Sequence, residues 1–326
     1  MAYQYQSILQ DEMQSFIDML SAAGRKVAGY QVFLKSLDQF LINSCVSEKA
    51  LPEELLVKWM DGFTCEASTK NRMITCCRVF GRYLMALEIQ AFLPDYVKEQ
   101  SDYIPYTFTD EEFRAIITAA DEFQGNIRET TQTSFVFPMV LRLLYCCGLR
   151  VNEALKLTWE NVDLTAGVLH IKNAKNDKDR DVPMDRSLTE MLRLFQNKAF
   201  AENPHSKYLF ESDRKPGTPY LDWTFRRWFL TILERAGITN ERDHKFDRGI
   251  SPHTLRHYFT YKSFIQAENA GRSLEQFAPF LSAYLGHNSL IETERYLATD
   301  YTLYKNSQER VGRLIDPLFP EVDFDE

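Results

Sequence analysis

The chain has 326 residues, of which 44% are hydrophobic and 26% are charged. This length allows two domains of ordinary size, and the composition is typical of a globular protein and excludes a disordered one. No uninterrupted apolar run approaches the ~20 residues of a membrane-spanning helix. The first residues lack the basic and apolar segments of a signal peptide. We therefore expect a cytoplasmic protein with no membrane partner.

The formal net charge of −8 is unfavourable for a partner that presents phosphate. Most of this charge, however, lies in two segments. Residues 95–130 carry −6 and residues 316–326 carry −5, so the remainder of the chain carries +3. The net charge therefore does not exclude a basic groove elsewhere, and it does not demonstrate one.

The cysteines and histidines of the chain do not form a metal-binding pattern. The six cysteines contain no C-x-x-C pair, and the six histidines lack ligand spacing relative to them. Four of the cysteines form two doublets, at 76–77 and 146–147, within apolar stretches. We expect reduced, mostly buried thiols and no metal site.

The first 92 residues read as helices only. Apolar residues recur at three- and four-residue spacing in Ile8–Leu20, Tyr30–Ile42 and Met73–Leu87. Within residues 70–82, four basic residues lie among apolar ones: Lys70, Arg72, Arg78 and Arg82. A solvated helix face is the ordinary interpretation of such a run, and contact with a DNA backbone is the functional alternative.

A linker is predicted at residues 93–108, which contain two prolines and no helical period. Thr109 and Glu112 then form a capping box that opens a helix. We therefore divide the chain into a helical domain, residues 1–104, and a second domain, residues 105–326.

The second domain has a mixed pattern. Helices are predicted at Phe135–Cys147 and Arg150–Leu157, followed by three short strands at Val162–Leu164, Val168–Lys172 and Asp181–Met184. Four further helices are predicted from serine start signals, namely Ser187, Ser251, Ser273 and Ser289.

Four clusters in this domain carry groups that could act on an anion. Arg150 follows a glycine and precedes Glu153 at the spacing of an ordinary helical ion pair. Lys175 lies in a charged turn between two predicted strands, where polar residues are common for solvation alone.

The other two clusters lie near helix starts. His253, Arg256 and His257 share one face at the start of a helix, where the dipole favours an anion. A metal held by the two histidines is an alternative, but no third ligand is evident. His287 follows a glycine and precedes Tyr296, and a lone helical tyrosine is usually a core or interface residue.

Taken together, these residue types answer a specific chemical need. Attack on a phosphodiester creates additional negative charge, which fixed cationic donors stabilise. Arginine suits this task because its planar fork binds two phosphate oxygens and stays protonated. Lysine can protonate a leaving alkoxide, histidine can accept a proton, and tyrosine can form an ester that conserves the bond energy.

In chain order the motifs are G-L-R-x-x-E, A-K-N-D-K-D-R-D-V-P-M, H-T-L-R-H and L-G-H, with a tyrosine nine residues after the last histidine. This set resembles the tyrosine recombinases and integrases over residues 110–300. The resemblance implies a mainly α fold with a small antiparallel sheet in the catalytic domain. It also implies that a helical core-binding domain and the catalytic domain form a clamp around duplex DNA.

The resemblance also implies a role for each site residue. Arg150 and Arg256 would clamp the scissile phosphate. Lys175 would protonate the leaving 5′-oxygen, and Tyr296 would be the nucleophile. His253 would assist proton transfer, and His287 would hydrogen-bond the phosphate.

Glu153 matches a family position that orients the first arginine, and His257 matches a supporting histidine. Ala174 and Asn176 stand where the family often has glycine, so Lys178 is the alternative acid. The spacing of Tyr301 and Tyr304 from His287 does not match that of the nucleophile.

The family further implies double-stranded DNA with a specific recombination site as substrate, four protomers on two sites, and no cofactor. The C-terminal tail could dock on a neighbouring protomer or on its own domain, and accessory proteins could take part. Three other functions stay open: a type IB topoisomerase, a DNA-binding protein without catalysis, and a helical scaffold.

Overall fold

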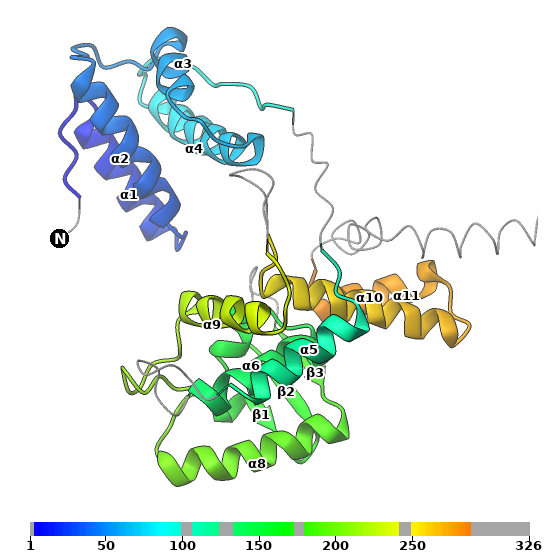
Figure 1. Cartoon of the computed structure of the whole chain (residues 1–326). Helices are drawn as coiled ribbons and strands as arrows, with labels where there is room; N and C mark the ends of the chain where they lie inside the picture. Colours follow the sequence, from blue (N-terminus) through cyan, green and yellow to red (C-terminus); the bar gives the residue numbers. More distant parts are fainter. Residues whose placement is uncertain (1–2, 99–105, 124–132, 173–178, 241–248, 288–326) are drawn as a thin grey trace, which may run out of the picture. The chain divides into compact units, whose positions relative to one another are not determined.

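The structure is a computed structural model that describes residues 3–98, 106–123, 133–172, 179–240 and 249–287. The chain divides into two compact units, Met1–Asp102 and Tyr103–Glu326 (Figure 1). This division falls two residues before the one expected from the sequence. Among the described residues, no helix combines the length and apolar character needed to cross a membrane.

The first unit consists of four helices in its described part: α1 (Gln10–Ala22), α2 (Ala28–Asn43), α3 (Glu53–Asp61) and α4 (Ala67–Ala86). One face of each helix is apolar, and these faces enclose a core that includes Phe16, Leu34, Leu37, Ile74 and Phe80. Helix α3 was not among the predicted helices, because its nine residues are too short for a clear period.

The second unit begins with α5 (Asp110–Asp121), α6 (Thr133–Cys147) and the short α7 (Val151–Leu155). A 3₁₀ turn (Trp159–Asn161) leads into the sheet. The later helices are α8 (Arg186–Glu202), α9 (Asp222–Arg235), α10 (His253–Asn269) and α11 (Leu274–Leu285).

The sheet of the second unit has three antiparallel strands in the order β1 (Val162–Asp163), β2 (Val168–Ile171) and β3 (Arg180–Pro183). Leu169 pairs with Val182, and Ile171 pairs with Arg180. The mainly α fold with a small antiparallel sheet, expected from the sequence, is therefore confirmed.

Helix α6 is the centre of the second core. Ten of its fifteen residues are buried, which explains its almost uninterrupted apolar sequence. It contacts α5, α7, α8 and α10. Phe137 on α6 packs edge-on against Phe225 and Trp228 of α9. Leu143, Leu144 and Cys147 at the C-terminal end of α6 are also buried, and this end leads directly into the candidate site.

Some predicted helix starts were wrong. Asp185, and not Ser187, is the N-cap of α8, since its carboxylate accepts from the Ser187 amide at 2.8 Å. The Ser251 side chain does not cap α10, which begins at His253 after Pro252. The capping boxes at Thr109 and Ser273 are confirmed. Helix α9 was not predicted, and the start at Ser289 lies outside the described residues.

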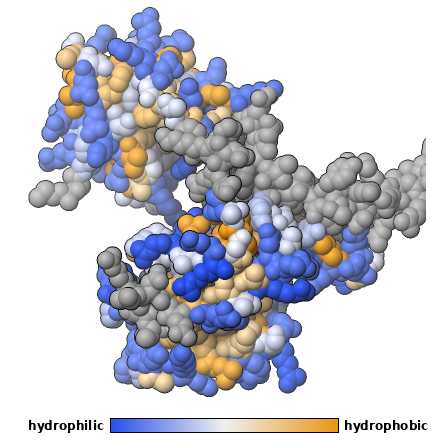
Figure 2. Space-filling model, viewed as in Figure 1, coloured by the Kyte–Doolittle hydropathy of each residue, from blue (hydrophilic) through white to orange (hydrophobic). Residues whose placement is uncertain are grey.

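Hydrophilic and hydrophobic residues are interspersed on the surface of both units (Figure 2). Large exposed apolar side chains occur on several different helices and do not follow one element; they include Val32, Leu194, Trp223 and Phe280.

Candidate active site

The turn after α6 presents the first arginine. Gly148 has a φ of 58°, and a Cβ at this position would lie 2.5 Å from a ring carbon of Phe259. Only glycine combines this left-handed conformation with so close an approach. The chain then extends through Arg150, the N-cap of α7, whose amide donates to the Glu153 carboxylate at 2.9 Å.

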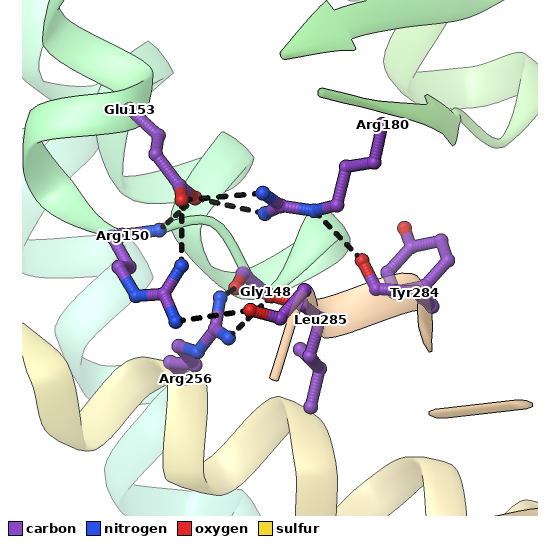
Figure 3. A network of polar contacts seen from close by, with 8 residues as sticks. Gly148, Arg150, Glu153, Arg180, Arg256, Tyr284 and Leu285 are labelled. Atoms are coloured by element: carbon purple, nitrogen blue, oxygen red, sulfur yellow. Dashed lines mark hydrogen bonds and ion pairs between the residues drawn. The ribbon is translucent and has the colours of Figure 1, made fainter. Parts of the chain in front are cut away.

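Glu153 is shared by two arginines (Figure 3). Its Oε1 lies 2.8 Å from Nη1 of Arg150, and its Oε2 lies 2.8 Å from Nη2 of Arg180. A further bond of 3.2 Å joins Nη1 of Arg180 to Oε1. Burial raises the pKa of this carboxyl, but hydrogen bonds and charge from Arg180, followed by bonds from Arg150, lower it to about 2. Glu153 is therefore an anion at neutral pH.

The C-terminal end of α11 supplies three consecutive carbonyl acceptors (Figure 3). Arg180 Nε donates to Tyr284 at 2.9 Å, and Arg256 Nη2 donates to Leu285 at 2.7 Å. Arg150 Nη2 makes a longer contact of 3.4 Å with the Gly286 carbonyl. The last carbonyls of a helix lack intrahelical partners and form the negative end of its dipole. They are suited to hold guanidinium groups.

Arg256 is the most enclosed of the three arginines. It projects from α10 with 1% of its surface exposed, and its Nη1 donates to the Gly148 carbonyl at 2.6 Å. Arg256 therefore ties the end of α6 to the end of α11. A guanidinium fixed in this way needs little reorganisation to meet an anion.

Three histidines accompany the arginines. His253 and His257 lie one turn apart on α10, with ring centroids separated by 4.8 Å, and His287 directly follows Gly286 with 8% exposure. Burial, followed by the charge of His253 and Arg256, lowers the pKa of His257 to about 3. Burial, followed by the charges of Arg256 and Arg150, lowers the pKa of His287 to about 3. Both rings are therefore neutral at pH 7 in the free protein.

The described part of the second unit thus holds six of the eight residues expected at the site: Arg150, Glu153, His253, Arg256, His257 and His287. Contacts and electrostatic effects link the arginines, Glu153, His257 and His287 directly. Lys175 and Tyr296 lie outside the described residues, as do the alternatives Lys178, Tyr301 and Tyr304.

Sequence reasoning missed one member of this cluster. Arg180 was quoted within the charged motif but was assigned no role. Its side chain is 9% exposed and contacts both Glu153 and the end of α11. The signal available in the sequence was its place directly before the predicted strand Asp181–Met184, where strand alternation puts Arg180 on the same face as the apolar Val182.

The four basic residues of α4 do not share one environment. Arg72 and Arg82 are exposed, and Lys70 is half-buried. Arg78 donates to the Pro94 carbonyl at 2.9 Å and lies over the ring of Tyr96. Its side chain therefore fixes residues 94–96 to α4, a structural role that the sequence did not suggest.

No group of three or more histidine, cysteine or acidic residues in the described ranges could hold a metal ion. The chemically distinctive feature here is a set of three arginines held by one carboxylate and a helix end. Such a cluster, on a helical fold with a small sheet, is suited to bind an anionic group such as a phosphate with fixed cations.

Comparison with known proteins specifies the class further. The chain belongs to the phage integrase family of tyrosine recombinases, because the profile of that family matches residues 107–302. The protein is accordingly a DNA recombinase. The matched range contains all four clusters recognised in the sequence, including Lys175 and Tyr296.

Among curated proteins, the chain is 28% identical over 242 residues to a putative integrase/recombinase, y4rB, of Sinorhizobium fredii, covering 72% of this chain and 76% of that one. It is 29% identical over 231 residues to tyrosine recombinase XerD of Pseudomonas putida, covering 69% of each.

Two solved structures share the fold. The XerH site-specific recombinase bound to difH substrate gives a TM-score of 0.64 at 18% identity, covering 91% of this chain and 83% of that one. A lambda integrase dimer bound to a COC′ core site gives 0.63 at 16% identity, covering 90% and 77%. The expected recombinase fold is thereby confirmed.

Proposed function

We propose that this protein carries out site-specific recombination by cleaving duplex DNA through Tyr296 and rejoining it without a metal or ATP. The observation that carries the proposal is the rigid placement of Arg150 and Arg256 on backbone carbonyls of the α11 end. Two fixed guanidiniums can bind the non-bridging oxygens of one phosphate and stabilise the charge that develops in attack.

In the proposed cleavage step, one phosphoester bond forms as another breaks. The Tyr296 hydroxyl oxygen forms a bond to phosphorus, and its proton passes to His253. The bond from phosphorus to the 5′-oxygen breaks, and Lys175 supplies the proton that this oxygen takes up. The 3′-phosphotyrosine ester conserves the bond energy, so attack by another 5′-hydroxyl restores the DNA and releases the tyrosine.

His287 and His257 have supporting roles in this proposal. Neutral His287 follows the carbonyls that hold the arginines, and it can donate a hydrogen bond to a phosphate oxygen. Half-buried His257 packs against His253 and supports its ring.

The proposed partners are a specific duplex site and further copies of the same chain. A related structure shows a lambda integrase tetramer bound to a Holliday junction. We propose by analogy that the two domains of each protomer form a clamp around duplex DNA. Four protomers would then exchange strands through such a junction. Accessory proteins and docking of the C-terminal tail, in cis or in trans, belong to the same proposal, as does a cytoplasmic location.

The test is a nicked suicide duplex that carries the DNA flanking the gene, incubated with the protein in EDTA. We expect a covalent protein–DNA band on a denaturing gel for the parent chain and for Tyr301→Phe, and none for Tyr296→Phe. A band that persists in Tyr296→Phe would assign the nucleophile elsewhere.

Two further outcomes would contradict the proposal. Binding to the duplex without any band, in the parent chain, would favour a DNA-binding role without catalysis. Relaxation of a supercoiled plasmid that lacks the site would instead indicate a topoisomerase.

A further inference from the structure

Arg180 has no part in the steps proposed above, yet it is at the centre of the polar network. It is the first residue of β3, and its backbone pairs with the buried Ile171 of β2. The charged sequence segment 174–179, which includes Lys175, immediately precedes this strand. The side chain leaves the sheet and reaches α7 and α11, so Arg180 connects three elements of the site (Figure 3).

The guanidinium of Arg180 is directed at protein acceptors. Each of its three nitrogens makes a bond: two to the Glu153 carboxylate and one to the Tyr284 carbonyl. The side chain also packs against Gly286, where an added Cβ would lie 3.1 Å from Nη1. Arg180 thus holds parts of the protein together. Arg150 differs, because its side chain is more exposed, at 24%.

The contact between Arg180 and Glu153 determines how Glu153 bonds to Arg150. If Arg150 were the only arginine beside Glu153, its guanidinium could donate to both carboxylate oxygens in a bidentate pair. Arg180 donates to both oxygens, and the Arg150 amide also donates to Oε2, so Arg150 keeps a single side-chain bond to Oε1. One carboxylate shared by two guanidiniums leaves a positive charge for an anionic substrate.

We propose that Arg180 is a positioning residue for the cleavage reaction, acting through Glu153 and the α11 end to orient Arg150 and His287. This inference rests on the proposed function, since it concerns the same reaction. Arg180 does not touch the phosphate. Its loss lets Glu153 rotate onto Arg150 and releases the carbonyl that precedes the Leu285–His287 segment.

The main experiment is a double-mutant cycle on the full chain, read as the single-turnover rate of covalent complex formation on the suicide duplex. We expect Arg180→Gln to slow cleavage about 100-fold, since small misplacements of catalytic groups have effects of this size. In a Glu153→Gln background, the same change should slow cleavage by less than about 3-fold, because residues that act through one another are not additive.

The matched control is Arg193→Gln. Arg193 also donates to a backbone carbonyl, that of Leu164, but it lies on α8 with 46% of its side chain exposed. This variant should cleave at the parent rate. Arg180→Lys keeps the charge without the fork, so it should recover only part of the lost rate.

A second readout separates positioning from a merely structural role. With Arg180 removed, Glu153 becomes easier to protonate, so the acidic limb of the pH–rate profile should move to higher pH in Arg180→Gln. Affinity for the uncleaved duplex should change little.

Three outcomes would overturn the inference. An equal rate loss in both backgrounds would show that Arg180 does not act through Glu153. A lower melting temperature with an unchanged rate in both Arg180 variants would make it structural only. An acidic limb of the pH–rate profile that does not move in Arg180→Gln would show that Arg180 does not control the protonation of Glu153. If the parent chain and the Arg193 control also fail to cleave, the proposed function fails instead.

Discussion

Arg256 on α10 donates a hydrogen bond to the carbonyl oxygen of Gly148 over 2.6 Å, although 108 positions separate the two residues. A buried guanidinium without acceptors would be strongly destabilising. The Gly148 carbonyl, directly after α6, and the Leu285 carbonyl, at the end of α11, meet this requirement. The site is therefore complete only when α6, α10 and α11 are packed together.

Replacing Arg256 with lysine should damage both catalysis and folding. Lysine keeps the charge but cannot bond two carbonyls in one plane. We expect Arg256→Lys to slow cleavage by at least about 100-fold and to lower the free energy of unfolding by about 2–4 kcal/mol. Single-turnover cleavage and urea unfolding measure the two effects. Arg193→Lys, at an exposed position, should change neither quantity. If the two variants had the same cleavage rate and unfolding free energy, Arg256 would not have the proposed role in the site.

Gly148→Ala tests the turn that presents Arg150. Its cost should exceed that of Gly237→Ala, because both glycines have positive φ but a Cβ at 237 meets nothing within 4 Å. The control should lose about 1–2 kcal/mol of unfolding free energy from backbone strain alone. Gly148→Ala should lose a further ~1–3 kcal/mol from the contact with Phe259. Equal losses would mean that the turn has room to adjust.

Much of this arrangement followed from the sequence, and the reasons for the rest are physical. The strands, α6 and the cluster around His253 and Arg256 have strong local patterns of apolar spacing and charge. The role of Arg180 depends on partners 27 and 104 positions away, which no local pattern encodes. Helix α9 is different, because its buried residues Phe225, Trp228, Phe229 and Ile232 recur at three- and four-residue spacing, so a local pattern was present and was overlooked.

Acid should destabilise the free protein through its neutral histidines. The pKa of His287 is lowered from 6.5 to about 3, so the unfolded chain binds a proton that the folded chain does not. His257 behaves in the same way. Their contribution to stability is complete above pH 6.5 and is lost as pH falls toward 3.

Urea unfolding at a series of pH values measures this effect. His287→Asn should flatten the slope within that window by up to about 1.4 kcal/mol per pH unit. The exposed His205→Gln should leave the slope unchanged. If His287→Asn also left it unchanged, the buried neutral ring would not be the source. Glu153, whose pKa is lowered to about 2, contributes a separate loss below pH 4.5.

The basic residues of α4 give a prediction about DNA binding. Each phosphate contact contributes about 0.9 to the slope of log affinity against log salt. If exposed Arg72 and Arg82 contact the backbone, Arg72→Gln and Arg82→Gln should each reduce the slope by about that amount, and Lys70→Gln by the same amount or less. Fluorescence anisotropy with a labelled duplex over a salt series provides the measurement.

Arg78→Gln should behave differently from its neighbours, because its guanidinium is bonded to the Pro94 carbonyl. We expect a loss of about 0.5–1.5 kcal/mol in unfolding free energy with little change in the salt slope. A full reduction of the slope in Arg78→Gln would show that this side chain releases residues 94–96 to reach DNA.

The three arginines share one kind of acceptor, the main-chain carbonyls of residues 284–286. Every residue type has a main-chain carbonyl, so a side-chain substitution in this segment does not remove an acceptor. Alanine scanning would therefore not detect these three acceptors. Backbone ester substitution, which weakens a single carbonyl as an acceptor, is the chemical change that would reveal the contribution of these carbonyls.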